Sequence, residues 1–308
     1  MAEGYRDFSM FLAERFPCKM QKLAVNAGFS CPNRDGSKGR GGCTYCNNQT
    51  FNPAYCAPAL GIRQQLEEGK RFFGRKYPDM RYLAYFQAYT NTHGDVGRLM
   101  AMYREALEVE KVDGLIIGTR PDCMPDELLE RLSELNREKS VIVEYGAETS
   151  HDVTLEAVNR CHTWQDTVDA VRRTAAAGIP VGLHLIVGLP GEDDEMVLAT
   201  VDRVSSLPVD TVKLHQLQLV RGTRMARDVE RGLYTVPQFT VDEYISLCCR
   251  IISRLNPAIA IERFVSQSPD ELLVSPRWGL KNYEFTHRLN ARIRQSGIQQ
   301  GSCYIPDR

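Results

Sequence analysis

Two features are scarce in this sequence: net charge and long apolar runs. The 38 basic and 39 acidic residues leave a formal net charge of −1. With that balance the molecule as a whole cannot attract nucleic acid by positive charge, although a local basic patch still could. The longest apolar stretch, residues 179–190, is interrupted by glycine, histidine and proline and is too short to span a bilayer. Residues 1–16 carry acids and no uninterrupted apolar core, unlike a signal peptide. We therefore expect a cytoplasmic protein with no membrane partner.

What is present favours a folded, metal-binding protein. Apolar residues make up 43% of the 308 positions, enough for a sizeable core, and charged residues make up 25%. The chain has ten cysteines, and four of them, Cys31, Cys43, Cys46 and Cys56, fall within 26 residues. Because a cytosolic protein keeps its thiols reduced, metal binding explains this cluster better than disulfides do.

Short apolar runs alternate with amphipathic stretches along the chain. Strand, helix, strand at this spacing predicts right-handed βαβ units and a parallel sheet, an α/β fold. About six such units make a partial (βα)6 barrel of the TIM type, whose active site forms at the C-terminal ends of the strands. The expected strands are Lys22–Ala27, Arg81–Gln87, Val112–Gly118, Val141–Tyr145, Ile179–Val187 and Thr211–Val220, with a weaker seventh at Ala258–Val265. The expected helices are Asp126–Asn136, Thr163–Ala177, Asp193–Leu207 and Val241–Leu255.

The end of the chain differs in composition. From Arg277 to Arg308 there are six Lys or Arg against two Asp or Glu residues, a net charge of +4. We expect residues 1–255 to form the barrel with an N-terminal helix, and residues 256–308 to form a C-terminal extension that covers the substrate.

The cysteine cluster reads C-x11-C-x2-C over Cys31, Cys43 and Cys46, directly after the first expected strand. The Cys-x-x-Cys pair can grip one metal or cluster, and glycines in the intervening loop permit tight turns. A structural zinc site is closed by four ligands, whereas a [4Fe–4S] cluster held by three cysteines leaves one iron open. The alternative is a zinc site with His93 or Cys56 as fourth ligand; otherwise Cys56 is a free thiol.

This pattern resembles the radical S-adenosylmethionine (SAM) superfamily. The usual spacing there is C-x3-C-x2-C, and a longer first gap occurs in the branch that contains the Elongator catalytic subunit. The whole chain is most similar to the bacterial YhcC/YtqA-type radical SAM proteins. The resemblance extends, in order, through segments at the ends of the expected strands: 87–92, 118–122, 144–149, 158–163, 184–192 and 213–223.

The resemblance implies the chemistry and the cofactors. One [4Fe–4S] cluster on the three cysteines binds SAM through its open iron. A low-potential electron donor of the flavodoxin or ferredoxin type reduces the cluster. Reductive cleavage of SAM then gives a 5′-deoxyadenosyl radical that abstracts hydrogen from a substrate.

It also implies which residues bind SAM. Gln87, Thr90 and Asn91 match the loop that meets the methionine amine, although Ala88 and Tyr89 replace the usual glycines there. The other implied contacts are Arg160 with the carboxylate, Glu148 with the ribose, and Tyr45, His184 and Gly188 with the adenine. Each has a simpler alternative: Arg160 as a surface ion-pair residue, Glu148 as a helix cap, His184 as a core histidine, and Gly188 as part of a turn.

The substrate-side candidates are charged or polar residues at the expected strand ends. They are Arg120, Asp122, Glu144, Lys213 and His215. Their positions at the strand ends place them over the barrel mouth. Side chains alternate along a strand, so Lys213 and His215 share one face, which is either the inner or the outer face of the sheet.

Two basic segments bear on the substrate. Arg63, Lys70, Arg71, Arg75 and Lys76 lie on or near one helix, and the basic C-terminal segment also carries aromatic residues. Such residues can hold RNA by phosphate contacts and base stacking, while a solvated surface is the simpler reason for them. With the Elongator resemblance, this favours tRNA, at a wobble uridine. The alternatives are a radical SAM enzyme acting on a small metabolite or a protein, and a non-catalytic, metal-containing RNA-binding protein.

Overall fold

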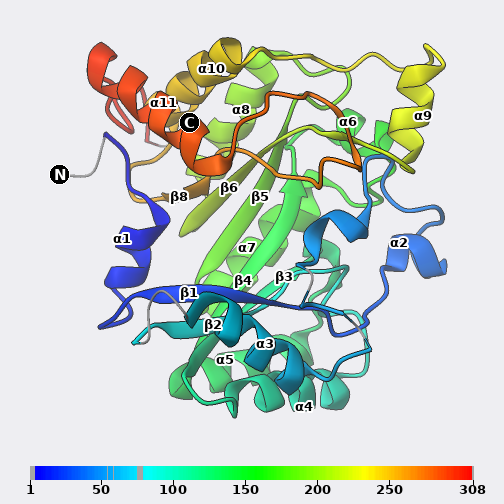
Figure 1. Ribbon diagram of the computed structural model, residues 1–308, viewed down its shortest axis with the longest axis vertical. Helices are drawn as coiled ribbons and strands as arrows, with labels where there is room; N and C mark the ends of the chain where they lie inside the picture. Colours follow the sequence, from blue (N-terminus) through cyan, green and yellow to red (C-terminus); the bar gives the residue numbers. More distant parts are fainter. Residues whose placement is uncertain (1–3, 54, 58, 75–78, 307–308) are drawn as a thin grey trace.

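Seven parallel strands form one curled sheet at the centre of the molecule. The computed structural model describes residues 4–53, 55–57, 59–74 and 79–306. The strand order is β1-β2-β3-β4-β5-β6-β8, so each strand of the sheet pairs with the one that precedes it in the chain, except that β8 follows β6 (Figure 1). These strands are β1 Met20–Val25, β2 Arg81–Phe86, β3 Val112–Thr119, β4 Ser140–Glu148, β5 Val181–Val187, β6 Thr211–Gln216 and β8 Ala260–Arg263.

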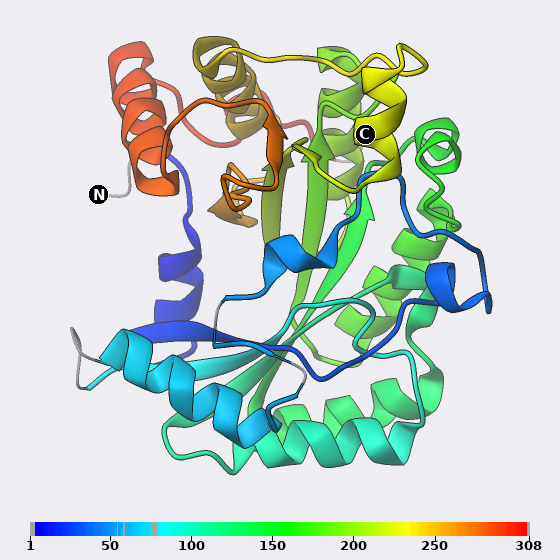
Figure 2. The same cartoon turned by 45° about the vertical axis from the view of Figure 1, so that its right-hand side comes forward.

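Several of the helices that connect the strands, among them α3, α4, α5 and α7, pack on the outer face of the sheet (Figures 1 and 2). The α/β half-barrel predicted from the sequence is therefore confirmed, and the weaker seventh strand joins it as β8. The helices are α1 Phe8–Ala13, α2 Pro32–Asp35, α3 Ile62–Gly74, α4 Val96–Leu107, α5 Asp126–Glu138, α6 Asp152–Ala157, α7 Trp164–Ala176, α8 Asp194–Ser205, α9 Arg224–Glu230, α10 Val241–Arg254 and α11 Asn282–Ser296, with 3₁₀ turns η1 at Asn48–Phe51 and η2 at Pro121–Cys123.

The prediction of one continuous strand over Thr211–Val220 was wrong in its second half. The run Thr211–Val220 breaks after Gln216, where β6 leaves the sheet. Leu219–Val220 forms a separate strand, β7, which pairs antiparallel with β9, Leu273–Ser275. A periodic apolar run shows that both pieces are extended, but it does not show that they pair with different partners.

The local signals for the helices were reliable because capping residues mark their starts. Helix α7 begins after Thr163, whose hydroxyl accepts from the Asp166 backbone N–H while the Asp166 side chain accepts from Thr163 in return. Thr240 and Glu243 form the same capping box at α10. These helices bury one face each in the main apolar core.

The two faces of the sheet bury different residues. Alternate side chains such as Ala84, Phe86 and Leu115 pack outward against the helices. Tyr85, Ile116 and neighbouring side chains point inward and pack against Phe11 and Leu12 of α1. Helix α1 therefore fills the inner side of the half-barrel near the start of the strands, and the far end of the inner face is left to polar residues.

The chain beyond residue 255 contributes to the same sheet. Strand β8 pairs with β6, and the backbone of Arg6 and Asp7 contacts Ile261 on the free side of β8. The following segment crosses toward β7, and α11 packs on α10 with Phe285, Leu289 and Ile293 buried. Arg75, Lys76 and Arg308, named above among the basic residues, lie outside the described residues.

Candidate functional site

A cavity of about 200 Å³ opens at the C-terminal ends of the strands. Ligands of parallel α/β sheets bind at this edge because the loops that follow the strands converge there. The lining comes from the cysteine loop on one side, from β3, β4 and β5 beneath, and from the segments after β6 and β8 on the other side. The cavity is lined by Cys31, Arg34, Cys43, Tyr45, Cys46, Asn47, Asn48, Thr50, Gln87, Tyr89, Thr90, Gly118, Thr119, Arg120, Glu144, Gly146, Glu148, Arg160, His184, Ile186, His215, Gln216, Leu217, Gln218, Val220, Ser266 and Ser268.

All three predicted cysteine ligands line this cavity as free thiols. Cys31 directly precedes α2, and Cys43 and Cys46 lie on the turn that follows the glycine-rich loop. Burial, together with the neighbouring Cys43 sulfur, raises the pKa of the Cys46 thiol to about 11. A bound metal reverses this preference, because its charge stabilises the thiolates.

Neither candidate for the fourth ligand of a zinc site lies beside the three cysteines. His93 Nε2 lies 2.8 Å from Asp35, and the buried Cys56 thiol lies 3.2 Å from Gln65 Oε1; neither His93 nor Cys56 lines the cavity. Within the described ranges, no three His, Cys, Asp or Glu side chains form a group that could hold a metal ion. Cysteines that bind different irons of one cluster do not have to meet at one ion.

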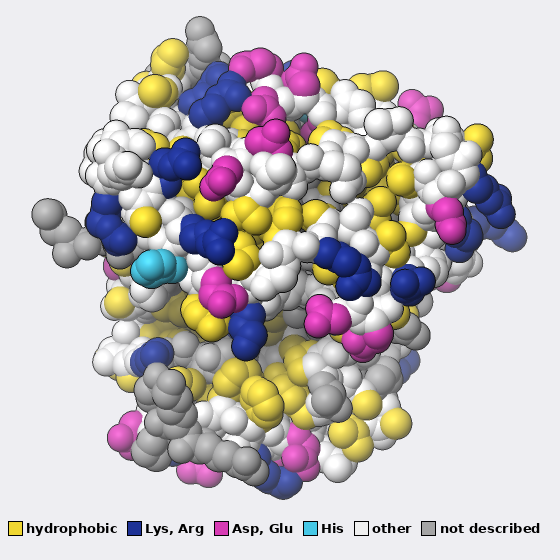
Figure 3. All heavy atoms as spheres, turned by 45° about the horizontal axis from the view of Figure 1, so that its top comes forward, with side chains coloured by type: hydrophobic (Ala, Val, Ile, Leu, Met, Phe, Trp, Pro, Cys, Tyr) yellow, Lys and Arg dark blue, Asp and Glu magenta, His cyan; other side chains and the backbone are white. Residues whose placement is uncertain are grey.

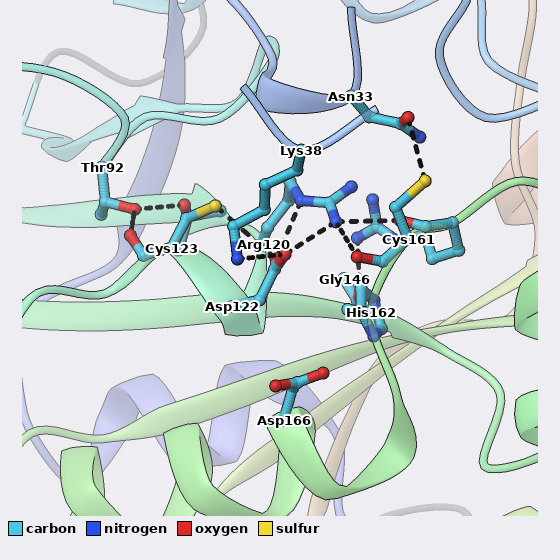
Figure 4. Close-up of polar contacts among 12 residues, drawn as sticks. Asn33, Lys38, Thr92, Arg120, Asp122, Cys123, Gly146, Cys161, His162 and Asp166 are labelled. Atoms are coloured by element: carbon cyan, nitrogen blue, oxygen red, sulfur yellow. Dashed lines mark hydrogen bonds and ion pairs between the residues drawn. The ribbon is translucent and has the colours of Figure 1, made fainter. Parts of the chain in front are cut away.

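The loop between Cys31 and Cys43 is fastened to the barrel by side chains from distant segments. Asn159, at a positive φ of 56°, donates its amide to the carbonyls of Arg40 at 3.1 Å and Gly42 at 2.8 Å. Lys38 reaches Asp122 at 2.9 Å, and the Cys161 thiol points at Asn33 (Figure 4). This long insertion therefore has a fixed fold on the protein surface.

Two of the predicted substrate residues, Asp122 and Arg120, differ in whether they line the cavity. Asp122 does not line the cavity; its carboxylate pairs with Arg120 and Lys38 (Figure 4). Arg120 does line it, is 2% exposed, and donates to the Asp122 carboxylate at 2.9 Å and to the carbonyl of Arg160 at 2.8 Å. Its Nη1 has no partner among the described residues.

Arg160 and Glu148 form a buried pair beside Cys43. Their side chains lie 3.3 Å apart, Arg160 donates to the carbonyl of Gly146 at 2.6 Å, and its Nη1 lies 3.7 Å from the Cys43 sulfur. A Cβ on Gly146 would lie 2.7 Å from both the Arg160 guanidinium and the Glu148 carboxylate, so a larger residue here would displace these two side chains. Arg160 is 6% exposed, which excludes the alternative of a surface ion-pair residue.

The remaining SAM candidates are placed differently from one another. Tyr45, Gln87 and Thr90 line the cavity. Asn91 does not: it is fully buried, and its amide donates to the carbonyls of Phe86 and Gly118, which ties the ends of β2 and β3 together. Gly188, at φ 94°, packs against the ring of Phe239 outside the lining.

Unsatisfied polar atoms gather around the cysteines. Tyr45 Oη, Arg120 Nη1 and Arg160 Nε are buried, and none has a hydrogen-bond partner among the described residues. Buried polar atoms normally find partners, so these three indicate a polar ligand with acceptor groups. A carboxylate and the hydroxyls of a ribose meet this requirement, and the residues therefore fit SAM beside a three-cysteine cluster.

Below the cysteines, the inner face of the sheet carries a buried ionic network. Glu144 on β4 is 1% exposed and contacts Lys22 Nζ at 2.8 Å, Lys213 Nζ at 2.8 Å and His184 Nε2 at 2.7 Å. Lys213 also pairs with Glu262 at 2.9 Å. Two lysines and two glutamates thus balance their charges, as a buried network must.

His215 continues this network toward the far wall. Its ring stands 5.3 Å from that of His184, and its Nδ1 lies 2.7 Å from Ser266 Oγ and 3.2 Å from Arg263 Nη2. The structure places Lys213 and His215 on the inner face, which settles the alternation that the sequence left open.

Sequence reasoning missed the wall formed by Gln216, Gln218, Ser266 and Ser268. The signal for the serines was available, because they follow β8 within a few residues at the same edge of the sheet.

Sequence reasoning also missed an exposed basic rim, which we define as the exposed Lys and Arg residues of the cysteine loop and of the segment around α9. The rim consists of Arg34, Lys38, Arg40, Arg221, Arg224, Arg227 and Arg231.

The basic C-terminal helix lies elsewhere. Figures 1 and 2 both place α11 on the opposite side of the molecule from α2 and α9. On the face seen in Figure 3, Lys and Arg side chains are interspersed with Asp and Glu around an apolar centre. The basic rim, unlike α11, adjoins the cavity: Asn47 donates to the carbonyl of Arg221 at 3.0 Å, and the Met225 N–H donates to the carbonyl of Thr44.

None of the helices in the described part of the chain combines the length and the apolar character that a membrane span requires.

Comparison with known proteins agrees with this geometry. Residues 31–204 match the model of the Radical SAM superfamily, and residues 209–295 match that of the Radical_SAM C-terminal domain. The chain is 34% identical to YtqA of Bacillus subtilis over 97% of its length and 92% of that protein. It is 36% identical to YhcC of Escherichia coli over 96% of its length and 94% of that protein.

More distant similarities concern part of the chain or the fold alone. A tRNA uridine(34) acetyltransferase of Methanocaldococcus jannaschii is 31% identical over 39% of this chain and 22% of that protein. The solved structure of Elp3 from Methanocaldococcus infernus superposes with a TM-score of 0.66 at 16% identity, covering 91% of this chain and 64% of that one. The similarities predicted from the sequence motifs are thus confirmed.

Proposed function

The chain belongs to the radical SAM superfamily, and we propose that it modifies tRNA at a wobble uridine with one [4Fe–4S] cluster and SAM. Cys31, Cys43 and Cys46 hold the cluster. The observation that carries this proposal is a single cavity that joins these three cysteines to the buried Arg160–Glu148 pair.

When bound, the cluster and SAM supply a one-electron cleavage that generates a hydrogen-abstracting radical. This chain's own residues bind and orient. The unpartnered Nε of Arg160 suits a carboxylate, and Glu148 accepts from two adjacent hydroxyls. The N–H groups of Asn33 and Arg160 near the Cys43 sulfur tune the cluster by hydrogen bonding. Electrons come from a flavodoxin- or ferredoxin-type donor.

Two observations support RNA as the substrate. The matched part of the chain is similar to proteins named for uridine 34 of tRNA. The basic rim stands at the mouth of the cavity, where phosphates on either side of an inserted nucleotide would lie. The rim replaces the C-terminal segment as the expected RNA contact.

Anaerobic reconstitution tests the cofactor chemistry. We expect a brown protein with about four irons per chain, and 5′-deoxyadenosine on addition of SAM and dithionite. Cys31→Ala removes one ligand and abolishes both, whereas Cys18→Ala, outside the cavity, retains both. A colourless protein that binds one zinc per chain would contradict the proposal.

Nucleoside profiling of a deletion strain tests the substrate. We expect one modified wobble uridine to disappear and its precursor to accumulate. Binding of total tRNA should weaken steeply with salt, and Arg40→Glu with Arg221→Glu should reduce the slope by about two. An unchanged nucleoside profile with an altered metabolite pool would point instead to a small substrate.

A further inference from the structure

His184 and Glu144 form a hydrogen-bonded pair in the floor of the cavity. His184 Nε2 lies 2.7 Å from Glu144 Oε2, and both residues line the cavity from adjacent strands. Gly182 makes room for the carboxylate, because a Cβ there would lie 3.1 Å from Glu144 Cγ. A buried carboxylate behind an imidazole is the arrangement that holds a catalytic histidine in one orientation.

Glu144 is ionised despite its burial. Desolvation alone would raise its pKa, but the charges of Lys213 and Lys22 and the hydrogen bond from His184 hold the pKa of Glu144 well below its usual range. Both lysines lie 2.8 Å from its oxygens. A carboxylate fixed in this way accepts hydrogen bonds only, so the shared hydrogen belongs to the histidine.

This contact fixes the tautomer of His184. Nε2 carries the hydrogen and donates it to Glu144, while Lys213, which is 3.3 Å away, has only donors and directs them to carboxylates and Tyr85. Nδ1 is therefore a lone-pair acceptor, and no described residue hydrogen-bonds it. The side chain is 19% exposed, within the cavity lining.

The charged groups around His184 keep the ring neutral. Burial and the charge of Lys213 lower its pKa, against the opposing effects of Glu144 and Glu148 on β4. His215, the neighbouring ring on β6, is also kept neutral, since burial and Arg263 lower its pKa well below the usual range. At neutral pH the cavity thus holds an unprotonated histidine backed by a carboxylate.

We propose that His184 is a catalytic base acting on the substrate, and that Glu144 is its positioning residue. Nδ1 removes a proton from an N–H or O–H group next to the carbon that loses its hydrogen atom. The electron pair of that bond stays on the heteroatom, no electron is transferred, and Glu144 stabilises the imidazolium that forms. The proton leaves to solvent with the product. The inference rests on the proposed function for the radical step, and it adds an acid–base step in the same cavity.

The sequence resemblance gave His184 a different role, contact with adenine. The two roles predict different results for His184→Gln, which keeps a donor for Glu144 but has no titratable nitrogen. If His184 is the base, its loss changes how much 5′-deoxyadenosine is formed for each product molecule. If His184 contacts adenine instead, its loss raises the KM for SAM and leaves that ratio unchanged.

Nitrogen-15 NMR of histidine-labelled full-length protein tests the tautomer without any substrate. The His184 signals, assigned from their loss in His184→Gln, should show Nε2–H and an unprotonated Nδ1 at pH 7. Glu144→Gln should shift the tautomer population. An Nδ1–H tautomer or an imidazolium at pH 7 would overturn the inference.

Turnover tests the base itself, with total tRNA from the deletion strain as the probe. We expect the ratio of 5′-deoxyadenosine to modified nucleoside to rise about 100-fold in His184→Gln, and the acid limb of the pH profile for nucleoside formation to disappear. His287→Gln, on exposed α11, serves as control. An unchanged ratio with a raised KM for SAM would refute the base role. Absence of 5′-deoxyadenosine from the wild type would refute the proposed function instead, and an Nδ1–H tautomer would overturn the base role independently of it.

Discussion

Lys22 and Glu262 form an ion pair across the open side of the half-barrel. Lys22 lies on β1 and Glu262 on β8, the two edge strands of the sheet. Both side chains are more than four-fifths buried, and each also joins the pair of Glu144 and Lys213 deeper inside. The network therefore links strands that no backbone hydrogen bond joins, and it reaches the functional cavity through Glu144.

We predict that Lys22→Met destabilises the protein more than the double variant Lys22→Met/Glu262→Gln. The single change leaves two buried glutamates with one lysine, at a cost of about 3 kcal/mol in the free energy of unfolding. The double variant restores the charge balance and recovers part of that loss. Urea unfolding followed by circular dichroism measures both, and a double variant as unstable as the sum of its single changes would contradict the coupling.

Asp122 should contribute stability that is lost in acid. Burial would raise its pKa, but the hydrogen bond and charge of Arg120, together with Lys38, hold the pKa of Asp122 at about 2. Because the folded value lies below the ordinary 3.8, the stabilisation is complete above about pH 5 and is lost as the pH falls toward 2.

The variant Asp122→Asn should therefore lose about 2 kcal/mol of unfolding free energy at pH 7, and less at pH 3. Urea unfolding at pH 7, 4 and 3 gives the comparison, with Asp242→Asn on the exposed side of α10 as control. A loss that is constant over this range would show that the charge of Asp122 has no part in it.

Periodicity and capping residues were enough to predict the half-barrel. Alternating β-branched runs with helices between them fix a parallel sheet, and the Thr163 and Thr240 capping boxes mark the helix starts. The break between β6 and β7 was not predictable, because it depends on β9 more than 50 residues later.

The cavity was predicted best where a motif and a strand end coincide. The three cysteines, Arg160 and Glu148 meet there, and their individual roles toward the cofactors stay predictions. Asn91 and Asp122 stand at strand ends too, yet their side chains turn to backbone carbonyls and to Arg120. Position along a strand does not show which neighbour satisfies a polar group, because that depends on segments far away in the sequence.

Glu148→Gln should weaken SAM binding. The change removes the buried charge opposite Arg160 and one strong acceptor in the cavity. A hydrogen bond to a charged group contributes about 1.5–3 kcal/mol, so we expect the KM for SAM to rise about 10- to 100-fold. The rate of 5′-deoxyadenosine formation against SAM concentration measures it, with exposed Glu156→Gln on α6 as control. An unchanged KM would remove Glu148 from the binding site.

Asn159 should control how firmly the cysteine loop holds a cluster. Its side chain binds two carbonyls of the loop between Cys31 and Cys43, and its backbone has a positive φ. Asn159→Ala loses the hydrogen bonds and adds backbone strain, whereas Asn159→Gly loses the hydrogen bonds only. Residues that orient metal ligands typically change metal affinity about 10- to 100-fold.

We therefore expect iron to leave both variants faster than the wild type when a chelator is added anaerobically to reconstituted protein, and fastest from Asn159→Ala. The two variants separate the contributions: a glycine variant equal to the wild type would assign the whole effect to backbone strain. Iron release unchanged in both would mean that Lys38, Asp122 and the loop's own turns suffice to fix it. The loop between Cys31 and Cys43 would then need no support from the Asn159 side chain, because the Lys38–Asp122 ion pair and the backbone hydrogen bonds of its turns would hold it in place.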